Sequence, residues 1–152
     1  TDGSSDSQAA VDFVNTLGFP ASSHIMILHV IKKQVYETER ALTTGRENEK
    51  EFAKLAEEFF EARGRQGANL LEYTSRTLSS NDLTIQKRLV YGNAADEILK
   101  AARLMKADLI VMGSHGSTGA KRVFLGSVSN KVVHSAGCSV AVIRNQKEKV
   151  IL

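Results

Sequence analysis

The run from Leu109 to Met112 is the strongest constraint on the fold, because it is continuously apolar and ends directly at Gly113. A short run without a polar face is typical of a strand covered on both sides, as the strands of a parallel sheet are. His24 to Ile31 forms a second, nearly unbroken apolar run of strand length. We therefore expect a sheet with buried parallel strands at the centre of the protein.

Hydrophobic spacing predicts the other elements. Apolar residues recur at helical spacing from Ser7 to Leu17, from Glu47 to Tyr73 with weak points at Gly64 and Gly67, after the capping residue Asn93, and from Val128 to Ala136; strands are expected over Leu83 to Tyr91 and Val140 to Ile143. Residues 33–46 are interpreted as an exposed connection. Strands that alternate with helices imply right-handed crossovers, so the predicted fold class is α/β, a doubly wound parallel sheet with helices on both faces.

Two glycine turns follow the central strand. Gly113 stands where the strand ends and Gly116 lies three residues further on, and both can let main-chain N–H groups approach a ligand closely because they lack Cβ. After nine more residues, Gly126 precedes Ser127, which we interpret as the N-cap of a helix. The N–H groups at a helix start carry roughly half a positive charge and bind anions. The two turns predict a phosphate site.

Other glycine motifs do not fit this spacing. A Walker A loop needs Lys and Ser or Thr directly after its second glycine, and no glycine pair here provides that. The dinucleotide fingerprint fails because His115 occupies the place of its second glycine. From the residues alone, the remaining pattern fits either a phosphate site or a tight turn followed by a capped helix in any α/β protein.

Composition favours one domain. The chain has 152 residues, 42% of them hydrophobic, which suits a single core. Cys138 is the single cysteine, so a disulfide framework is excluded, and neither a membrane span nor a signal peptide is visible; we expect a cytoplasmic protein. The net charge of +3 is spread among acidic residues without a basic block, which makes nucleic acid an unlikely partner.

The glycine pattern resembles that of a known family. Gly113-Ser-His-Gly116, Gly126-Ser127, Met112 before the first glycine and the opening Thr1 to Ser4 together resemble the universal stress protein family, in particular its ATP-binding branch. This resemblance implies an open five-stranded parallel sheet of strand order 3-2-1-4-5, of the Rossmann-like, adenine nucleotide alpha-hydrolase-like type. It also implies a homodimer formed through the last strand, Val140 to Ile143.

The resemblance further implies a ligand and a site. ATP would bind with Mg²⁺ or Mn²⁺ bridging its phosphates. Asp2 would lie beside the adenosine, Val30 would wall the base and Met112 would pack under the nucleoside, while the glycine turns would hold ribose and phosphates. The implied binding residues are Asp2, Val30, Met112, Gly113, Gly116, Gly126, Ser127, Val128 and Ser129.

Catalysis is less well supported than binding. No acid and base pair and no nucleophile with a partner base can be placed from the sequence, and no catalytic residue or protein metal site is predicted. His115 is either a phosphate contact or a loop side chain that points to solvent. The resemblance implies a regulatory or protective role in stress with at most slow ATP hydrolysis. The alternative is a dimeric scaffold of the same fold that binds no nucleotide.

The first strand of the family pattern is missing before Thr1. The segment Lys149 to Leu152, followed by an opening such as Thr1 to Ser4, would form a suitable strand and turn. Three explanations remain open besides a frayed tail: the sequence is a segment of a longer chain, the tail begins a second repeat, or the tail fills the central place as a permuted or swapped strand. A return within one molecule is hard, because five residues extend at most about 17 Å.

Overall fold

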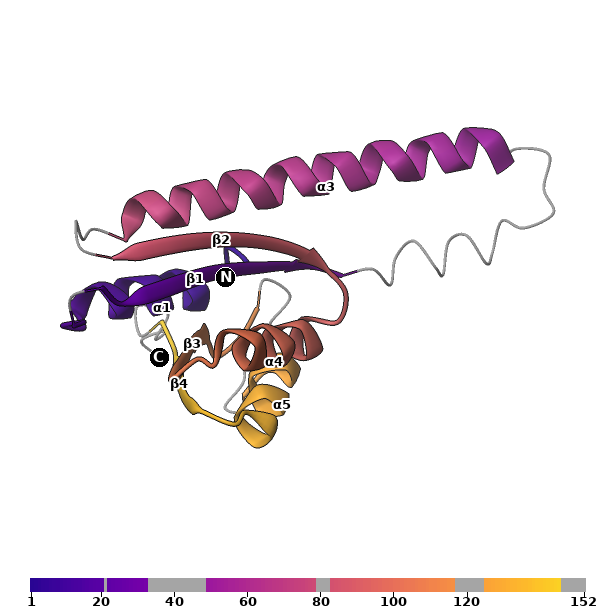
Figure 1. Ribbon diagram of the computed structural model, residues 1–152. Helices are drawn as coiled ribbons and strands as arrows, with labels where there is room; N and C mark the ends of the chain where they lie inside the picture. The colour runs from indigo at the N-terminus through magenta and orange to yellow at the C-terminus, as the bar shows by residue number, and fades with distance from the viewer. Residues whose placement is uncertain (21, 33–48, 79–82, 117–124, 146–152) are drawn as a thin grey trace, which may run out of the picture.

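A computed structural model describes residues 1–20, 22–32, 49–78, 83–116 and 125–145, with only the backbone for residues 49–53. Helices and strands alternate along the chain (Figure 1). In order they are α1 (Ser5–Thr16), β1 (His24–Ile31), α3 (Glu49–Thr77), β2 (Thr84–Tyr91), α4 (Ala94–Met105), β3 (Leu109–Gly113), α5 (Ser127–Ser135) and β4 (Ser139–Ile143). The predicted α/β class is confirmed, and each helix and strand expected from hydrophobic spacing or an apolar run is present, with its ends shifted by a few residues at most.

The strands form two parallel pairs. β1 pairs with β2, with His24 opposite Thr84 and Ile31 opposite Tyr91. β3 pairs with β4, and Leu109 lies opposite Ser139. Within the described ranges these are separate two-stranded sheets, and the predicted five-stranded sheet is not seen there, because no described segment forms a strand between β1 and β3.

One core lies between α3 and the β1–β2 pair. Its buried members are Val11 of α1, Ile27 of β1, Leu71 of α3 and Leu78, which directly follows α3. Val14, Ile25, Ile85 and Leu89 pack around them, half-buried. Burying such aliphatic side chains contributes about 1.5–3 kcal/mol each, so this cluster fixes α3 along the two strands, as Figure 1 shows.

The second core covers one face of the β3–β4 pair. Ala95 and Leu99 of α4 meet Val132 of α5, whose side chain is completely buried, and Met112 of β3 packs against them. The next residue, Gly113, faces α1 instead, since a Cβ built on it would lie 2.7 Å from backbone atoms of that helix. Successive strand residues point to opposite faces, so helices cover both sides of β3, as predicted.

α3 is one continuous helix of 29 residues, despite its two glycines. It runs well past the end of the β1–β2 pair in Figure 1. Gly67 is buried, and a Cβ there would lie 2.7 Å from Leu89 and 2.8 Å from His29. The glycine therefore allows the helix to approach the strands closely. The connection expected over residues 33–46 and the tail Lys149 to Leu152 lie outside the described residues.

Candidate functional site

The site lies where β1 and β3 end, and the start of the chain joins the two. The ammonium group of Thr1 donates to the Leu28 carbonyl at 2.8 Å, and the Thr1 carbonyl is 2.8 Å from Nδ1 of His29. On the other side, the Ser4 hydroxyl donates to the His115 carbonyl at 3.2 Å. Residues 1–4 therefore connect the carboxyl end of one strand pair to that of the other, where ligands of such sheets bind.

The two glycine turns contact each other directly. The Gly126 N–H donates to the Ser114 carbonyl at 2.9 Å, and the Ser129 hydroxyl donates to the same carbonyl at 2.8 Å. A Cβ built on Gly126 would lie 3.0 Å from that carbonyl oxygen. A side chain at Gly126 would press on the Ser114 carbonyl, so glycine at this position favours a close contact between the turns.

The cap of α5 differs from the prediction. Gly126 is the N-cap and provides no side-chain capping bond, and Ser127 is the first helical residue. The Asn130 N–H donates to the Gly126 carbonyl at 2.9 Å, which is the first hydrogen bond within the helix. The shift arises because glycine adopts the extended N-cap backbone here while its N–H is used by the other turn. The first-turn donors are then Ser127, Val128 and Ser129.

The first glycine turn is packed against the start of α1. A Cβ on Gly113 would lie 2.7 Å from the backbone of Asp6 and Ser7, and one on Gly116 would lie 2.7 Å from Oδ2 of Asp2. Backbone cannot give way as a flexible side chain can. Gly113 is therefore needed for helix packing, and Gly116 for the approach of the Asp2 carboxylate.

The other predicted residues divide between surface and core. Asp2 and Ser127 are exposed, and Asp2 accepts a hydrogen bond from the Ser4 N–H at 3.0 Å. Met112 and Val128 pack against the core between α4 and α5. Val30 lies half-buried in β1 opposite Val90. The described contacts bring Asp2 to the first glycine turn, at Gly116, whereas they do not join Val30 to either turn.

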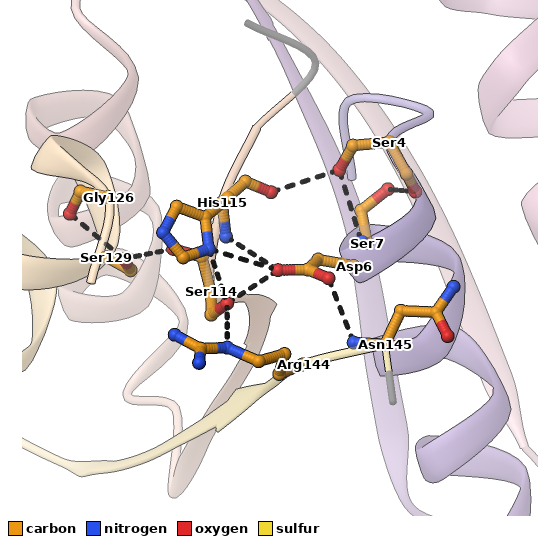
Figure 2. Close-up of polar contacts among 9 residues, drawn as sticks. All are labelled: Ser4, Asp6, Ser7, Ser114, His115, Gly126, Ser129, Arg144 and Asn145. Atoms are coloured by element: carbon orange, nitrogen blue, oxygen red, sulfur yellow. Dashed lines mark hydrogen bonds and ion pairs between the residues drawn. The ribbon is translucent and has the colours of Figure 1, made fainter. Parts of the chain in front are cut away.

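Asp6 forms a buried polar network that sequence reasoning missed (Figure 2). Its Oδ2 accepts from the Ser114 hydroxyl at 2.5 Å and from the His115 N–H at 3.0 Å, and it lies 3.4 Å from Nδ1 of the His115 ring. Its Oδ1 accepts from the Asn145 N–H at 2.9 Å. Arg144 approaches from the end of β4, with Nε 3.5 Å from the Ser114 hydroxyl. One carboxylate thus links α1, the first glycine turn and the end of β4.

Comparison with known proteins places the chain in a family. The sequence pattern of the Universal stress protein family matches residues 1–144. The chain belongs to the universal stress protein family. Its sequence is 31% identical to universal stress protein YxiE of Bacillus subtilis over 147 residues, which are 94% of each chain.

Solved structures agree with this assignment of the fold. The structure of MJ0577 from Methanocaldococcus jannaschii matches with a TM-score of 0.78 at 24% identity, over 96% of this chain and 92% of that one. A universal stress protein in complex with cAMP matches with a TM-score of 0.59 at 19% identity, over 95% and 91% of the two chains. At these identities the likeness concerns the fold.

Asp6 of this universal stress protein is held as a carboxylate. Burial raises the pKa of Asp6, but hydrogen bonds from Ser114, Asn145 and His115 outweigh it and hold that pKa below its usual range. The Asp6 side chain is 10% exposed and the His115 side chain 19%. His115 is therefore mostly enclosed, which argues against the solvent-facing alternative.

A weak signal in the sequence could have revealed Asp6. It stands four residues before Ala10, which is buried, and so lies on the inner face of α1. A carboxylate on an inner helix face needs donors. The sequence does not say which donors, because Ser114 and Asn145 are more than 100 residues away.

Among the described residues, no group of three or more His, Cys, Asp or Glu side chains could hold a metal ion. In the same part of the chain, no helix is both long and apolar enough to cross a membrane.

Proposed function

We propose that this universal stress protein binds ATP at the two glycine turns. The observation that carries the proposal is the direct contact between the turns, Gly126 N–H to Ser114 carbonyl, beside the start of α5. That helix has no acidic residue in its first turn, so no carboxylate of that turn repels an anion. Phosphates would meet the N–H groups of Ser127 and Val128, and Asp2 would accept hydrogen bonds from the ribose or the base.

The remaining predicted contacts complete the proposed site. Gly113 and Gly116 would border the ribose and first phosphate, Val30 would wall the base and Met112 would support the nucleoside from the core. Ser129 would contribute its N–H group, since its hydroxyl already donates to the Ser114 and Gly126 carbonyls and the residue is 2% exposed. Mg²⁺ or Mn²⁺ would arrive with the nucleotide and neutralise its phosphates.

The chemistry of a structural neighbour supports an adenine nucleotide. One matching universal stress protein was solved in complex with cAMP. cAMP shares adenine, ribose and one phosphate with ATP, so a site for either must hold the nucleoside. They differ in the phosphates that the start of α5 would bind.

Thermal unfolding with and without nucleotide tests the proposal. A ligand at a hundredfold excess over its dissociation constant stabilises the folded state by about 2.7 kcal/mol. We expect ATP with Mg²⁺ to raise the melting temperature more than AMP or cAMP does. No shift with any nucleotide would instead favour the alternative function, a scaffold without a nucleotide site.

The variant Ser127→Glu tests whether the nucleotide binds at the start of α5. The exposed carboxylate would stabilise the helix itself by about 0.3–1 kcal/mol, while repelling phosphates. We expect the variant to melt at or above the wild-type temperature without ATP and to lose most of the ATP-induced shift. Ser127→Gln is the neutral control of similar size. An unchanged ATP shift in Ser127→Glu would place the nucleotide elsewhere.

The biological role follows from binding rather than catalysis. We infer a regulatory or protective role in the stress response, with at most slow ATP hydrolysis and a cytoplasmic location. Phosphate release over hours at saturating ATP, against a Ser127→Glu control, measures the hydrolysis.

We also propose that the two strand pairs belong to one five-stranded sheet in a single domain spanning residues 1–152. In the strand order 3-2-1-4-5 implied by the family resemblance, β2 and β1 lie on one side of a central strand, and β3 and β4 lie on the other. The hydrogen bond from Thr1 to the Leu28 carbonyl supports this sheet, because a strand paired with β1 on the side away from β2 would donate to the same carbonyl. The segment Lys149 to Leu152, within one molecule or from a neighbour, is one candidate for that strand.

The exposed edge of β4 supports a homodimer. Val140 to Ile143 is apolar, lacks proline, and pairs with β3 on one side only within the described residues. An apolar strand edge of this kind attracts a symmetric partner strand. We propose that two copies join through β4.

A further inference from the structure

Asp6, Ser114 and His115 form a chain of hydrogen bonds with a defined direction. Asp6 is a carboxylate and can only accept, so the Ser114 hydroxyl donates its hydrogen to Oδ2 at 2.5 Å. Nδ1 of His115 lies 2.8 Å from the Ser114 oxygen and 3.4 Å from Oδ2 of Asp6. Both of these atoms face Nδ1 as acceptors, because the serine hydrogen is already used. Nδ1 must therefore carry a hydrogen.

A hydrogen on Nδ1 determines the state of the other ring nitrogen. In a neutral imidazole one nitrogen carries hydrogen and the other holds a lone pair. Nε2 is then the nitrogen that can take up a proton. Figure 2 shows Nδ1 on the side of Asp6 and Nε2 on the side of Gly126 and Ser129, where α5 begins.

We propose that Asp6 and Ser114 hold His115 as its Nδ1–H tautomer, so that Nε2 takes a proton from solvent when a phosphate binds and donates it as a hydrogen bond to that phosphate. This inference rests on the proposed nucleotide site and names a phosphate contact within it. Nδ1–H keeps its bond to Ser114 throughout, so one proton is gained and none is transferred to Asp6. His115 becomes a binding residue, and Asp6 and Ser114 are positioning residues.

Charged side chains lie around the His115 ring. Asp6 of α1 faces Nδ1, and Asp2 lies against the neighbouring Gly116. Arg144, after β4, is a cation near this group, and its Nε is directed at the Ser114 hydroxyl. No acidic side chain lies in the first turn of α5. A bound polyphosphate adds negative charge beside Nε2, and opposite charges at short range stabilise the imidazolium form.

Ring nitrogen spectra of ¹⁵N-histidine-labelled protein test the tautomer without any ligand. At pH 8 we expect a pyrrole-type Nδ1 and a pyridine-type Nε2 for His115. Asp6→Asn and Ser114→Ala should move the ring toward the Nε2–H tautomer that histidine prefers in water. The two variants remove different members of the chain, and circular dichroism checks that each is folded. An Nε2–H tautomer in the wild type, or no change in either folded variant, would overturn the proposal.

Titration with sodium tripolyphosphate tests the phosphate contact apart from the nucleoside. We expect Nε2 of His115 to change from the lone-pair to the protonated form as tripolyphosphate is added. His115→Gln should weaken ATP binding about tenfold, which corresponds to about 1.4 kcal/mol, and leave adenosine binding unchanged. His24→Gln, an exposed histidine at the opposite end of β1, is the control.

The outcomes separate this inference from the proposed function. If tripolyphosphate protonates Nε2 but ATP binds no more tightly than tripolyphosphate, the nucleotide function fails and the phosphate contact stands. If ATP stabilises the protein while Nε2 keeps its lone pair, the inference fails and the nucleotide function stands. Equal loss of ATP and adenosine binding in His115→Gln would also overturn it, because the histidine would then act on the loop as a whole.

Discussion

Asp6 is the residue on which the geometry of the site depends most. Its two oxygens accept hydrogen bonds from Ser114, His115 and Asn145, which lie on two different segments. Removing the carboxylate leaves these donors buried without an acceptor, and each such group costs about 1–3 kcal/mol. Asp6 of α1 therefore holds the first glycine turn in place, independently of any ligand.

Asp6→Asn should change how stability depends on pH. The ordinary pKa of an aspartate side chain is about 3.9. Hydrogen bonds hold the pKa of Asp6 below that ordinary value, despite the opposing effect of burial. A carboxylate whose pKa is lowered by folding contributes its full stabilisation at pH values above its ordinary pKa. This stabilisation is lost as the pH falls through the pKa of the folded state. Urea unfolding from pH 3 to pH 7 measures this. Above pH 5, the free energy of unfolding of Asp6→Asn should be lower than that of the wild type by on the order of 1–3 kcal/mol. The difference should shrink below about pH 4.

Asp12→Asn is the matched control for this experiment. Asp12 lies on the same helix but is exposed, and its carboxylate accepts from the Gln8 side chain at 3.1 Å. We expect little effect of this change at any pH, since exposed pairs contribute little. A loss of unfolding free energy in Asp6→Asn that stays constant down to pH 3 would contradict the stabilising role proposed for the Asp6 charge.

At the scale of elements, α3 shows how tertiary packing overrides local propensity. Two glycines within one helix cost about 1 kcal/mol each relative to alanine, yet the helix is unbroken. Their surroundings differ. A Cβ at Gly67 would meet Leu89 and His29 at 2.7 Å and 2.8 Å, whereas one at Gly64 would meet only the Tyr91 hydroxyl, at 3.1 Å.

Alanine at the two glycines should therefore have opposite effects. Gly64→Ala should raise the free energy of unfolding by about 0.4–1 kcal/mol, because the exposed Tyr91 side chain can move aside. Gly67→Ala should lower it, and Gly67→Val should lower it by about 1–3 kcal/mol, since the His29 ring is held by its bond to Thr1. Chemical denaturation measures all three variants. Stabilisation by Gly67→Ala would show that α3 is not packed this closely.

The place between β1 and β3 gives a second prediction about elements. The Ile31 carbonyl faces β2, so alternate residues of β1 present the N–H groups of Met26, Leu28 and Val30 to the other side. If a central strand lies there, these amides should resist hydrogen exchange. Loss of this protection on deleting residues 149–152 would identify the tail as that strand. Rapid exchange in the full sequence would contradict the five-stranded sheet.

For the whole molecule, the orientation of β4 decides how a dimer can form. The Ser139 N–H donates to Asp108 and the Ile143 carbonyl accepts from Ser114, so these residues face β3. Strand groups alternate in direction, which leaves the N–H groups of Val140 and Val142 on the outer edge. A partner strand would pair with them.

Val142→Pro should prevent this association. Proline removes the outward N–H of Val142 without removing a bond to β3, and edge strands tolerate proline on that side. We expect the wild type to sediment as a dimer at micromolar concentration and the variant as a monomer. Val142→Thr keeps the N–H and the side-chain shape and should remain a dimer. A monomeric wild type would contradict the proposed interface.

The sequence by itself determined the α/β class, the family and the bounds of β1, because these depend on local patterns: apolar runs, helical spacing and the distances between glycines. It also placed the cap Asn93, whose side chain accepts from the Asp96 N–H. These features need no knowledge of distant partners.

Only the tertiary structure decided the polar network and the true cap of α5. Asp6 meets residues more than 100 positions away, and no local pattern encodes which donors a buried carboxylate finds. Gly126, rather than Ser127, is the N-cap: its backbone is extended, its carbonyl accepts the first helical hydrogen bond and its N–H donates to the other turn. Hydrogen bonds between segments distant in sequence are fixed by packing, so they become visible only once the chain is folded.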